Sequence, residues 1–214
     1  MKHTLLFASI MLSIMPLSLM ADWGACNVGT VSDIGVQIQS KTDDADFTAF
    51  TLSAAGAALS GKTDAIGFAT GQAKLKGDCE IVAQVTNISV GDQDSAGGGL
   101  MIRENFGPSS KFFAAGCTRG HGIRSYIRSR ESGPIAREEN CTDCNPPTWL
   151  KIVRQGDHFT SYKSMDGRIW LQINEGDVPM KKAVWVGAFA TSGGGQPVAE
   201  IGFDHVVARQ TAGQ

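Results

Sequence analysis

The feature that most constrains this chain is a long series of short β-forming runs separated by turn residues. From Cys79 onward, clusters of glycine, serine and aspartate interrupt the sequence about every ten residues, a spacing typical of β-sandwiches and barrels. No long stretch keeps the apolar period of a helix, and only residues 178–182 are expected to form a short helical turn. The predicted strands are residues 80–90, 99–104, 112–117, 123–130, 148–154, 159–164, 169–174, 184–191 and 200–208.

The N-terminal part of the chain gives weaker signals and belongs to the same domain. Strands are predicted there over residues 36–40, 47–52 and 65–70, and no proline-rich or charged linker separates them from the rest. We therefore expect one all-β domain over residues 22–209 and a tail over 210–214. Asp166-Gly167 is the strongest hairpin signal, because both residues tolerate the positive φ of a tight turn.

The first 21 residues have the pattern of a secretory signal peptide. Lys2 precedes an apolar run over residues 5–20, and Ala21 is a small residue where a signal peptidase would cut. A membrane-spanning helix is the alternative, but the run contains Pro16 and is short for a hydrocarbon core of about 30 Å. We expect cleavage after Ala21, a secreted or periplasmic location, and no stable membrane span in the mature chain.

All five cysteines lie beyond the predicted leader, so they remain in the mature chain and can form disulfides in an oxidising compartment. Cys141 and Cys144 lack the second ligand pair of a zinc site, and prolines follow them in place of the helix of a redox motif. A loop disulfide is therefore expected, in which Cys141 and Cys144 pair with each other or with Cys117. The odd number of cysteines leaves one thiol free or available to another chain.

Six segments in a fixed order resemble one group of secreted domains. They are GDCEIVAQVT at 77–86, GLMIRE at 99–104, WLKIVR at 149–154, FTSY with SMDG and a tryptophan at 159–170, VWVG at 184–187 and FDHV at 203–206. Together they resemble the DUF1349 and regulation-of-enolase-like group of the concanavalin A-like lectin and glucanase superfamily. The resemblance implies a jelly-roll sandwich of two antiparallel sheets with one concave face, and it implies no activity.

Carboxylate spacing gives no support for a hydrolase. The related glucanases carry Glu-x-Asp-x-x-Glu on a strand, because hydrolysis needs two carboxylates beside the scissile bond. Neither Glu131, nor Glu138-Glu139, nor residues 200–204 reproduce that spacing, and no Gly-x-Ser-x-Gly elbow is present. We expect a non-catalytic protein, with a divergent glycoside hydrolase or lyase as an alternative.

Alternation over residues 123–130 predicts a binding face. Arg124, Tyr126, Arg128 and Arg130 share one side of this run, while the isoleucines share the other. Guanidinium groups suit carboxylate or sulfate groups, and aromatic rings stack on sugars. If the following strands pair in chain order, Trp149 and Lys151 extend this face.

The resemblance places Arg103 at a recurring position, either in a buried ion pair with Glu104 or in the floor of a ligand site. A solvated strand face is the alternative for the whole set, because an arginine that faces water needs no ligand. The candidate ligand-binding residues are Arg103, Arg124, Tyr126, Arg128, Trp149, Lys151 and Trp185. A carbohydrate or glycoconjugate is the expected partner.

Other partners follow from charge and ligand type. A net charge of −2 and a pI near 6.1 provide no cationic surplus for a nucleic acid. Asp92 and Asp94, with Asp64 or Asp204, have the oxygen ligands that Ca²⁺ prefers, so structural calcium is a candidate although no calcium loop is present. A structural or protein-interaction module, joined to an unknown partner by an edge strand or the odd cysteine, is the second functional hypothesis.

Overall fold

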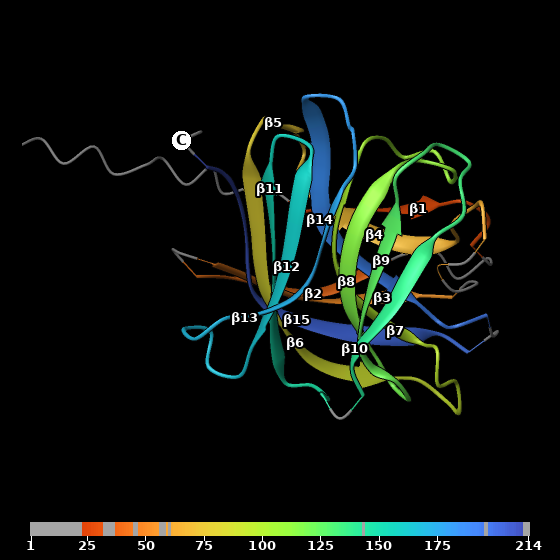
Figure 1. Ribbon diagram of the computed structural model, residues 1–214. Coiled ribbons are helices and arrows are strands. Elements are labelled where there is room, and N and C mark those ends of the chain that lie inside the picture. Colours follow the sequence, from red (N-terminus) through yellow and green to blue (C-terminus); the bar gives the residue numbers. More distant parts are fainter. Residues whose placement is uncertain are drawn as a thin grey trace, which may run out of the picture.

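The computed structural model describes residues 23–31, 37–44, 47–55, 59, 61–142, 144–194 and 197–211 (Figure 1). Side chains are described from residue 48 onward within the segment 37–55. The predicted signal peptide, residue 36 of the first predicted strand and residues 212–214 of the predicted tail lie outside these ranges.

Strands are the only regular secondary structure of the described residues. They form two sheets in which neighbouring strands are all antiparallel (Figure 1). The first, eight-stranded sheet has the order β1-β4-β14-β7-β8-β9-β10, with β5 beside β14, and the second, seven-stranded sheet has the order β13-β12-β11-β6-β15-β3-β2. The strands are β1 Gly24–Val28, β2 Gln37–Asp44, β3 Phe47–Ala54, β4 Ile66–Thr70, β5 Leu75–Lys76, β6 Cys79–Ser89, β7 Gly97–Arg103, β8 Phe112–Thr118, β9 Gly122–Arg128, β10 Ala136–Cys141, β11 Thr148–Gln155, β12 His158–Ser164, β13 Leu171–Asp177, β14 Ala183–Thr191 and β15 Ala199–Gln210.

This architecture confirms the predicted all-β sandwich. Every predicted run coincides with a strand, whereas β1, β5 and β10 were not predicted. The predicted helical turn at residues 178–182 is wrong, because that segment is a loop. The carbonyls of Met180, Lys181 and Lys182 accept hydrogen bonds from the Arg154 guanidinium, so they are not paired with helical amides. In the part of the chain that the structure describes, no helix has the length and apolarity needed to cross a bilayer.

The main core lies between the two sheets. Alternate residues of β6 point into it, as Cys79, Ile81, Ala83 and Val85 are all fully buried. Their neighbours on the strand are partly exposed, which is the pattern of a strand with one face in the core and one in solvent. The seven-stranded sheet therefore has an open outer face along β6 and β11.

The centre of the eight-stranded sheet is buried on both faces. Its outer face carries a second apolar cluster, here called the outer cluster, which is separate from the main core. Every residue of β7 and β8 is buried, so something must cover the side that a lone sandwich would expose to water. The cover consists of loops, which include Leu59 and Ile135. The outer cluster is Val28, Leu59, Ile66, Phe68, Met101, Phe112, Ala114, Tyr126 and Phe189.

The predicted hairpin at Asp166-Gly167 is confirmed. It joins β12 to β13, and Gly167 has a φ of 71°. One carboxylate oxygen of Asp166 accepts hydrogen bonds from the Ser164 hydroxyl and from the amides of Arg168 and Ile169. These bonds lower the pKa of Asp166 to about 2, so the turn is held by a permanently charged carboxylate at neutral pH.

Candidate functional site

Cross-strand pairing arranges the candidate residues of the outer face in rows. One row crosses four neighbouring strands, and each of its members is paired with the next. The members are Trp185 of β14, Arg103 of β7, Phe112 of β8 and Arg128 of β9. A neighbouring row ends with Tyr126 of β9 opposite Arg137 of β10. Side chains directly opposite each other on adjacent strands share a face, so Arg137 joins the face that alternation predicted.

Asp64 clamps two of the arginines beneath the loops. One of its carboxylate oxygens lies 2.8 Å from Nη2 of Arg128 and the other lies 3.3 Å from Nη2 of Arg103. All three side chains are completely buried. The arginines also lie over aromatic rings, with the Arg128 guanidinium carbon 5.0 Å from the centroid of Phe112. We call Asp64, Arg103 and Arg128 the arginine clamp.

The arginine clamp holds the covering loops on the sheet. Arg103 donates to the carbonyls of Asn105 and Gly107 in the loop after β7. Arg128 donates to the carbonyls of Gly133, Pro108, Ser110 and Gly61, which belong to three different loops. The two guanidinium groups therefore tie the loops after β3, β7 and β9 to the sheet through backbone carbonyls. The arginine clamp thus has a structural role that accounts for both arginines.

The expectation that the guanidinium side of residues 123–130 faces solvent is wrong for Arg124 and Arg128, whereas Arg130, beyond the end of β9, is exposed. Exposure is 0% for Arg103 and Arg128, 4% for Arg124 and 6% for Tyr126. Alternation placed these side chains on the correct face, but loops far away in sequence cover that face. Arg103 does lie in a buried ion pair, but the partner predicted for it, Glu104, is wrong: Arg103 pairs with Asp64, while Glu104 pairs with Lys111.

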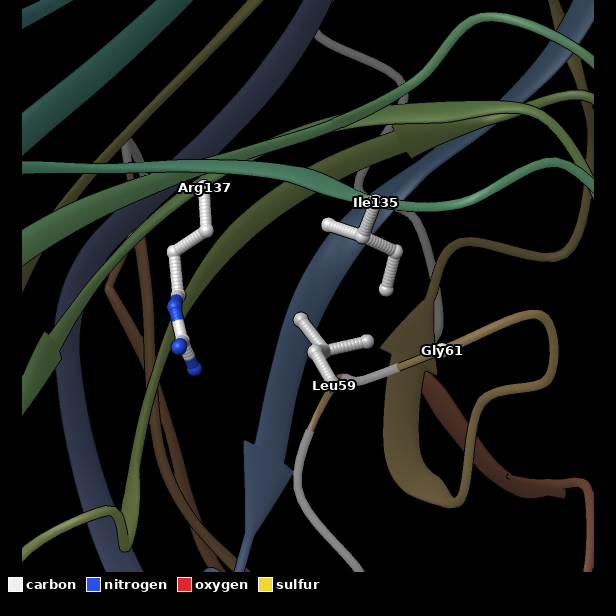
Figure 2. A pocket seen from close by; sticks show the side chains of 4 residues that line it. All are labelled: Leu59, Gly61, Ile135 and Arg137. Carbon is white, nitrogen blue, oxygen red and sulfur yellow. The ribbon is translucent and has the colours of Figure 1, made fainter.

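An open hollow of about 310 Å³ remains on this covered face, lined by Leu59, Gly61, Ile135 and Arg137. Figure 2 shows Ile135 and Arg137 projecting to the same side, with Leu59 reaching toward Ile135 from the opposite side. Arg137 is exposed and has no hydrogen-bond or ion-pair partner among the described residues. The hollow therefore combines two aliphatic side chains with a guanidinium group that has no ion-pair partner.

Beside the hollow, Arg124 and Glu139 form an ion pair across β9 and β10. Nη2 of Arg124 lies 2.5 Å from a carboxylate oxygen of Glu139, and this hydrogen bond holds the pKa of Glu139 below its ordinary value. Nε of Arg124 is buried and has no hydrogen-bond partner. Burial raises the pKa of Tyr126, so its hydroxyl is a neutral hydrogen-bonding group at neutral pH.

A second hollow of about 320 Å³ is lined by Thr86, Asn87, Ile88, Arg119, Asn145 and Pro146. Its guanidinium group is already committed, because Arg119 lies 3.2 Å from Asp92 and 3.5 Å from Asp94. The first hollow is therefore the better candidate site, since its arginine carries no such internal partner.

Trp149 and Lys151 do not extend the arginine face, which corrects the expectation based on chain-order pairing. Their strand, β11, lies in the seven-stranded sheet, and β10 is the strand that follows β9 in the eight-stranded sheet. The Lys151 ammonium lies 4.8 Å from the ring centre of Tyr162 and 4.3 Å from that of Trp170. Burial lowers the pKa of Lys151. These side chains form an aromatic site on the opposite side of the sandwich.

Trp185 does lie on the outer face of the eight-stranded sheet, at the other end of the row that contains Arg103. Its ring centre is 4.5 Å from that of Phe106, and the Lys74 ammonium lies 5.6 Å from the ring. Strands β7 and β8 separate Trp185 from β9 and the hollow.

Three of the four proposed calcium ligands are paired with arginines, and the fourth, Asp204, lies 3.1 Å from Nδ1 of His205. Asp92 and Asp94 pair with Arg119, and Asp64 lies inside the arginine clamp. Adjacent cations oppose the binding of another cation at these carboxylates. The described residues contain no group of three histidine, cysteine or acidic side chains that is suited to a metal ion.

The predicted disulfide between Cys141 and Cys144 is confirmed, and the alternative pairing with Cys117 is wrong. Cys26, Cys79 and Cys117 are free. The odd number of cysteines required at least one free thiol, and the chain has three. Burial raises the pKa of Cys79 to about 11 and that of Cys117 to about 12. Both thiols are therefore protonated and inaccessible at neutral pH.

Several solved structures share this architecture. A protein of unknown function from Saccharomyces cerevisiae has a TM-score of 0.65 at 16% sequence identity, with 87% of this chain and 98% of that chain covered. The carbohydrate-binding module CBM66 from Bacillus subtilis has a TM-score of 0.51 at 16% identity, with coverage of 91% and 99%. Lectin II from Ulex europaeus has a TM-score of 0.48 at 10% identity, with coverage of 87% and 92%.

No protein family and no curated protein matches the sequence. At these identities the structural similarity establishes the fold and leaves the activity open. The fold is a concanavalin A-like jelly-roll sandwich of two antiparallel sheets, as the order of the sequence motifs implied.

Proposed function

We propose that this protein binds carbohydrate in the hollow formed by Leu59, Gly61, Ile135 and Arg137. The observation that carries the proposal is the combination of aliphatic side chains and an unpaired guanidinium group in an open recess of about 310 Å³. Binding sites for small ligands are mostly apolar recesses with a few hydrogen-bonding groups that fix the orientation of the ligand. The arginine clamp and the Arg124–Glu139 pair brace the strands and loops around the hollow, so the recess is preorganised.

The fold is compatible with this function. CBM66, whose name describes a carbohydrate-binding module, is covered over 99% of its length by this chain. The candidate site here is assigned from the residues of this protein, because fold similarity at 16% identity does not transfer a binding site.

A glycan array followed by calorimetry tests the proposal. The purified protein should bind at least one glycan, and Arg137→Ala and Ile135→Ala should each weaken that binding about tenfold, equivalent to about 1.4 kcal/mol. Arg168→Ala is the matched control, because Arg168 lies in the hairpin of the opposite sheet. Circular dichroism should show unchanged folding for all three variants. Failure to bind any glycan, or binding that is indifferent to both changes at the hollow, would contradict the proposal.

A non-catalytic role is part of the same proposal. Glycoside hydrolysis needs two carboxylates beside the scissile bond. None of the described residues that line the hollow is acidic, and the nearby Glu139 is ion-paired with Arg124. Incubation with the polysaccharide that binds should therefore release no reducing sugar, and measurable release would overturn this part of the proposal.

Secretion and kinship with the DUF1349 group complete the proposal. The signal-peptide pattern of residues 1–21 and the Cys141–Cys144 disulfide support export to an oxidising compartment. N-terminal sequencing of protein from the medium or periplasm should begin at Asp22.

The motifs that resemble the DUF1349 group lie on β6, β7, β11, β12, β14 and β15, one motif to a strand, which supports the kinship.

A further inference from the structure

The outer face of the eight-stranded sheet holds more positive than negative charge around the hollow. Four arginines face this side, namely Arg103, Arg124, Arg128 and Arg137, and they share two carboxylates, Asp64 and Glu139. The chain as a whole has a net charge of −2, so this surplus is a local property of the face. Three of the four arginines are buried, where charge interactions are screened less than at the surface.

The arginine clamp lies directly behind the hollow. Gly61 lines the hollow, and its carbonyl oxygen lies 3.4 Å from Nη2 of Arg128. Asp64 has two arginine partners, and one carboxylate balances only one of these two cations. The remaining positive charge acts through a short stretch of protein, in which the effective dielectric constant is lower than in water.

Two further guanidinium groups point toward the same ligand chemistry. Arg137 lines the hollow without an internal partner, and it stands beside Glu139 on β10. Arg124 has a buried Nε–H group that lacks an acceptor. An anionic ligand oxygen is the acceptor that guanidinium groups bind best, and of these two arginines Arg137 is the one that lines the hollow.

We infer that the ligand of this site is an acidic saccharide, whose carboxylate or sulfate group binds at Arg137 in the positive field of the arginine clamp. This inference rests on the proposed carbohydrate-binding function and specifies its substrate class. The anionic group lies at the guanidinium end of the hollow, while the partly buried Ile135 contacts the apolar face of the sugar ring. Uronic acids carry carboxylate groups and sulfated sugars carry sulfate groups, and a guanidinium group can bind either anion.

Matched pairs of polysaccharides test the inference by calorimetry on the full protein. Polygalacturonate is compared with its fully methyl-esterified form, and dextran sulfate with dextran, so that the members of each pair share a sugar backbone and only one of them is anionic. We expect at least one acidic polymer to bind about tenfold or more tightly than its neutral counterpart. The polymer that binds identifies the source of the anionic group as a carboxylate or a sulfate.

Two charge-removing variants separate site binding from general attraction of polyanions. Arg137→Gln should reduce the affinity for the acidic polymer about tenfold, whereas Arg168→Gln, on the opposite sheet, should leave it unchanged. Equal losses in both variants would overturn the inference, because they indicate unspecific charge attraction. Equal affinity for the charged and the neutral polysaccharide of a pair, together with loss of binding in Arg137→Gln, would overturn the inference but leave the proposed function in place. Absence of binding to every glycan would remove both.

Discussion

The outer faces of the two sheets are built in opposite ways. On the eight-stranded sheet, arginines are buried beneath loops and are paired with carboxylates and carbonyls. On the seven-stranded sheet, Trp149, Lys151 and Trp170 are only partly buried. The β12–β13 hairpin beside them exposes large apolar side chains, with 81% exposure at Met165 and 71% at Ile169.

This difference shows that the polarity of a strand face does not decide whether the face is exposed. The cationic face is covered because guanidinium groups satisfy the carbonyls of the loops that cross it. The aromatic face stays open because Lys151 lies against Tyr162 and Trp170, which keeps a charge and two rings together at the solvent boundary. Four predictions test this contrast, beginning with the largest expected effect.

Asp64→Asn should be the most damaging change. It removes the only carboxylate of the arginine clamp and leaves two buried guanidinium groups without a counter-charge, which typically costs about 3–5 kcal/mol. Urea denaturation followed by circular dichroism measures the loss in the free energy of unfolding. Asp94→Asn is the matched control, because Asp94 is 70% exposed beside Arg119, and it should cost less than about 1 kcal/mol. Similar losses in the two variants would show that the covered face does not depend on its buried carboxylate.

Gly167→Ala tests the support of the open aromatic face. A Cβ atom at Gly167 would lie 3.0 Å from Cε2 of Trp149, and the backbone φ of 71° is strained for alanine. We expect a loss of about 1–3 kcal/mol in the same unfolding measurement. Gly156→Ala is the control, because its φ is 63° but no atom lies within 4 Å of the added Cβ. A loss no larger than that of the control would show that the turn does not pack on Trp149.

A double-mutant cycle compares the cation–π contacts of the two faces. Replacing Lys151 by Met and Trp170 by Leu, singly and together, should reveal a coupling energy of about 0.5–1 kcal/mol, since the ammonium lies 4.3 Å from the ring centre. The corresponding cycle for Lys74 and Trp185, at 5.6 Å, should give a smaller coupling. The reverse order would contradict the assignment of Lys151 as part of the open aromatic site.

The smallest expected effect is a dependence of stability on pH at the edge of the seven-stranded sheet. A hydrogen bond with Asp177, 2.8 Å away, and the charge of Glu175 raise the pKa of His158 above its ordinary value of 6.5. The contribution of protonated His158 is therefore fully present below pH 6.5 and is lost as the pH rises through the raised pKa. The arginine clamp contains no histidine, so this dependence belongs to the open sheet.

Thermal unfolding at a series of pH values measures this contribution. The melting temperature of the wild-type protein should fall slightly as the pH rises above 6.5, and His158→Gln should remove that part of the decrease. An unchanged pH profile in His158→Gln would show that the ion pairs with Asp177 and Glu175 do not contribute to stability.

Much of the fold was predictable because strands and turns follow local rules. Alternation correctly placed Arg124 and Tyr126 on the face opposite the main core, and aspartate with glycine correctly marked the β12–β13 hairpin. The sequence of β10 was not recognised as a strand, because AREENC has no apolar alternation. Arg137, which lines the candidate site, was missed for that reason. The edge pairing of β10 with β9 is the signal that locates it.

The chemical role of several residues depended on partners far away in the chain. Asp64 looked like a calcium ligand, since a carboxylate near glycines gives no local indication of two buried arginines around it. Trp149 was placed beside the arginines on the assumption that strands pair in chain order, yet β11 pairs with β6 and β12. The candidate binding residues were therefore divided between two opposite faces of the sandwich.

The sequence by itself determined which segments extend, where the chain turns, which side chains share a strand face, and that Cys141 and Cys144 could pair. These properties depend on neighbours a few residues apart, because backbone geometry sets the two-residue alternation of a strand. Only the tertiary structure decided which strands became neighbours and which faces were covered. Those outcomes depend on contacts such as that between Asp64 and Arg128, whose strength arises only after distant loops have excluded water.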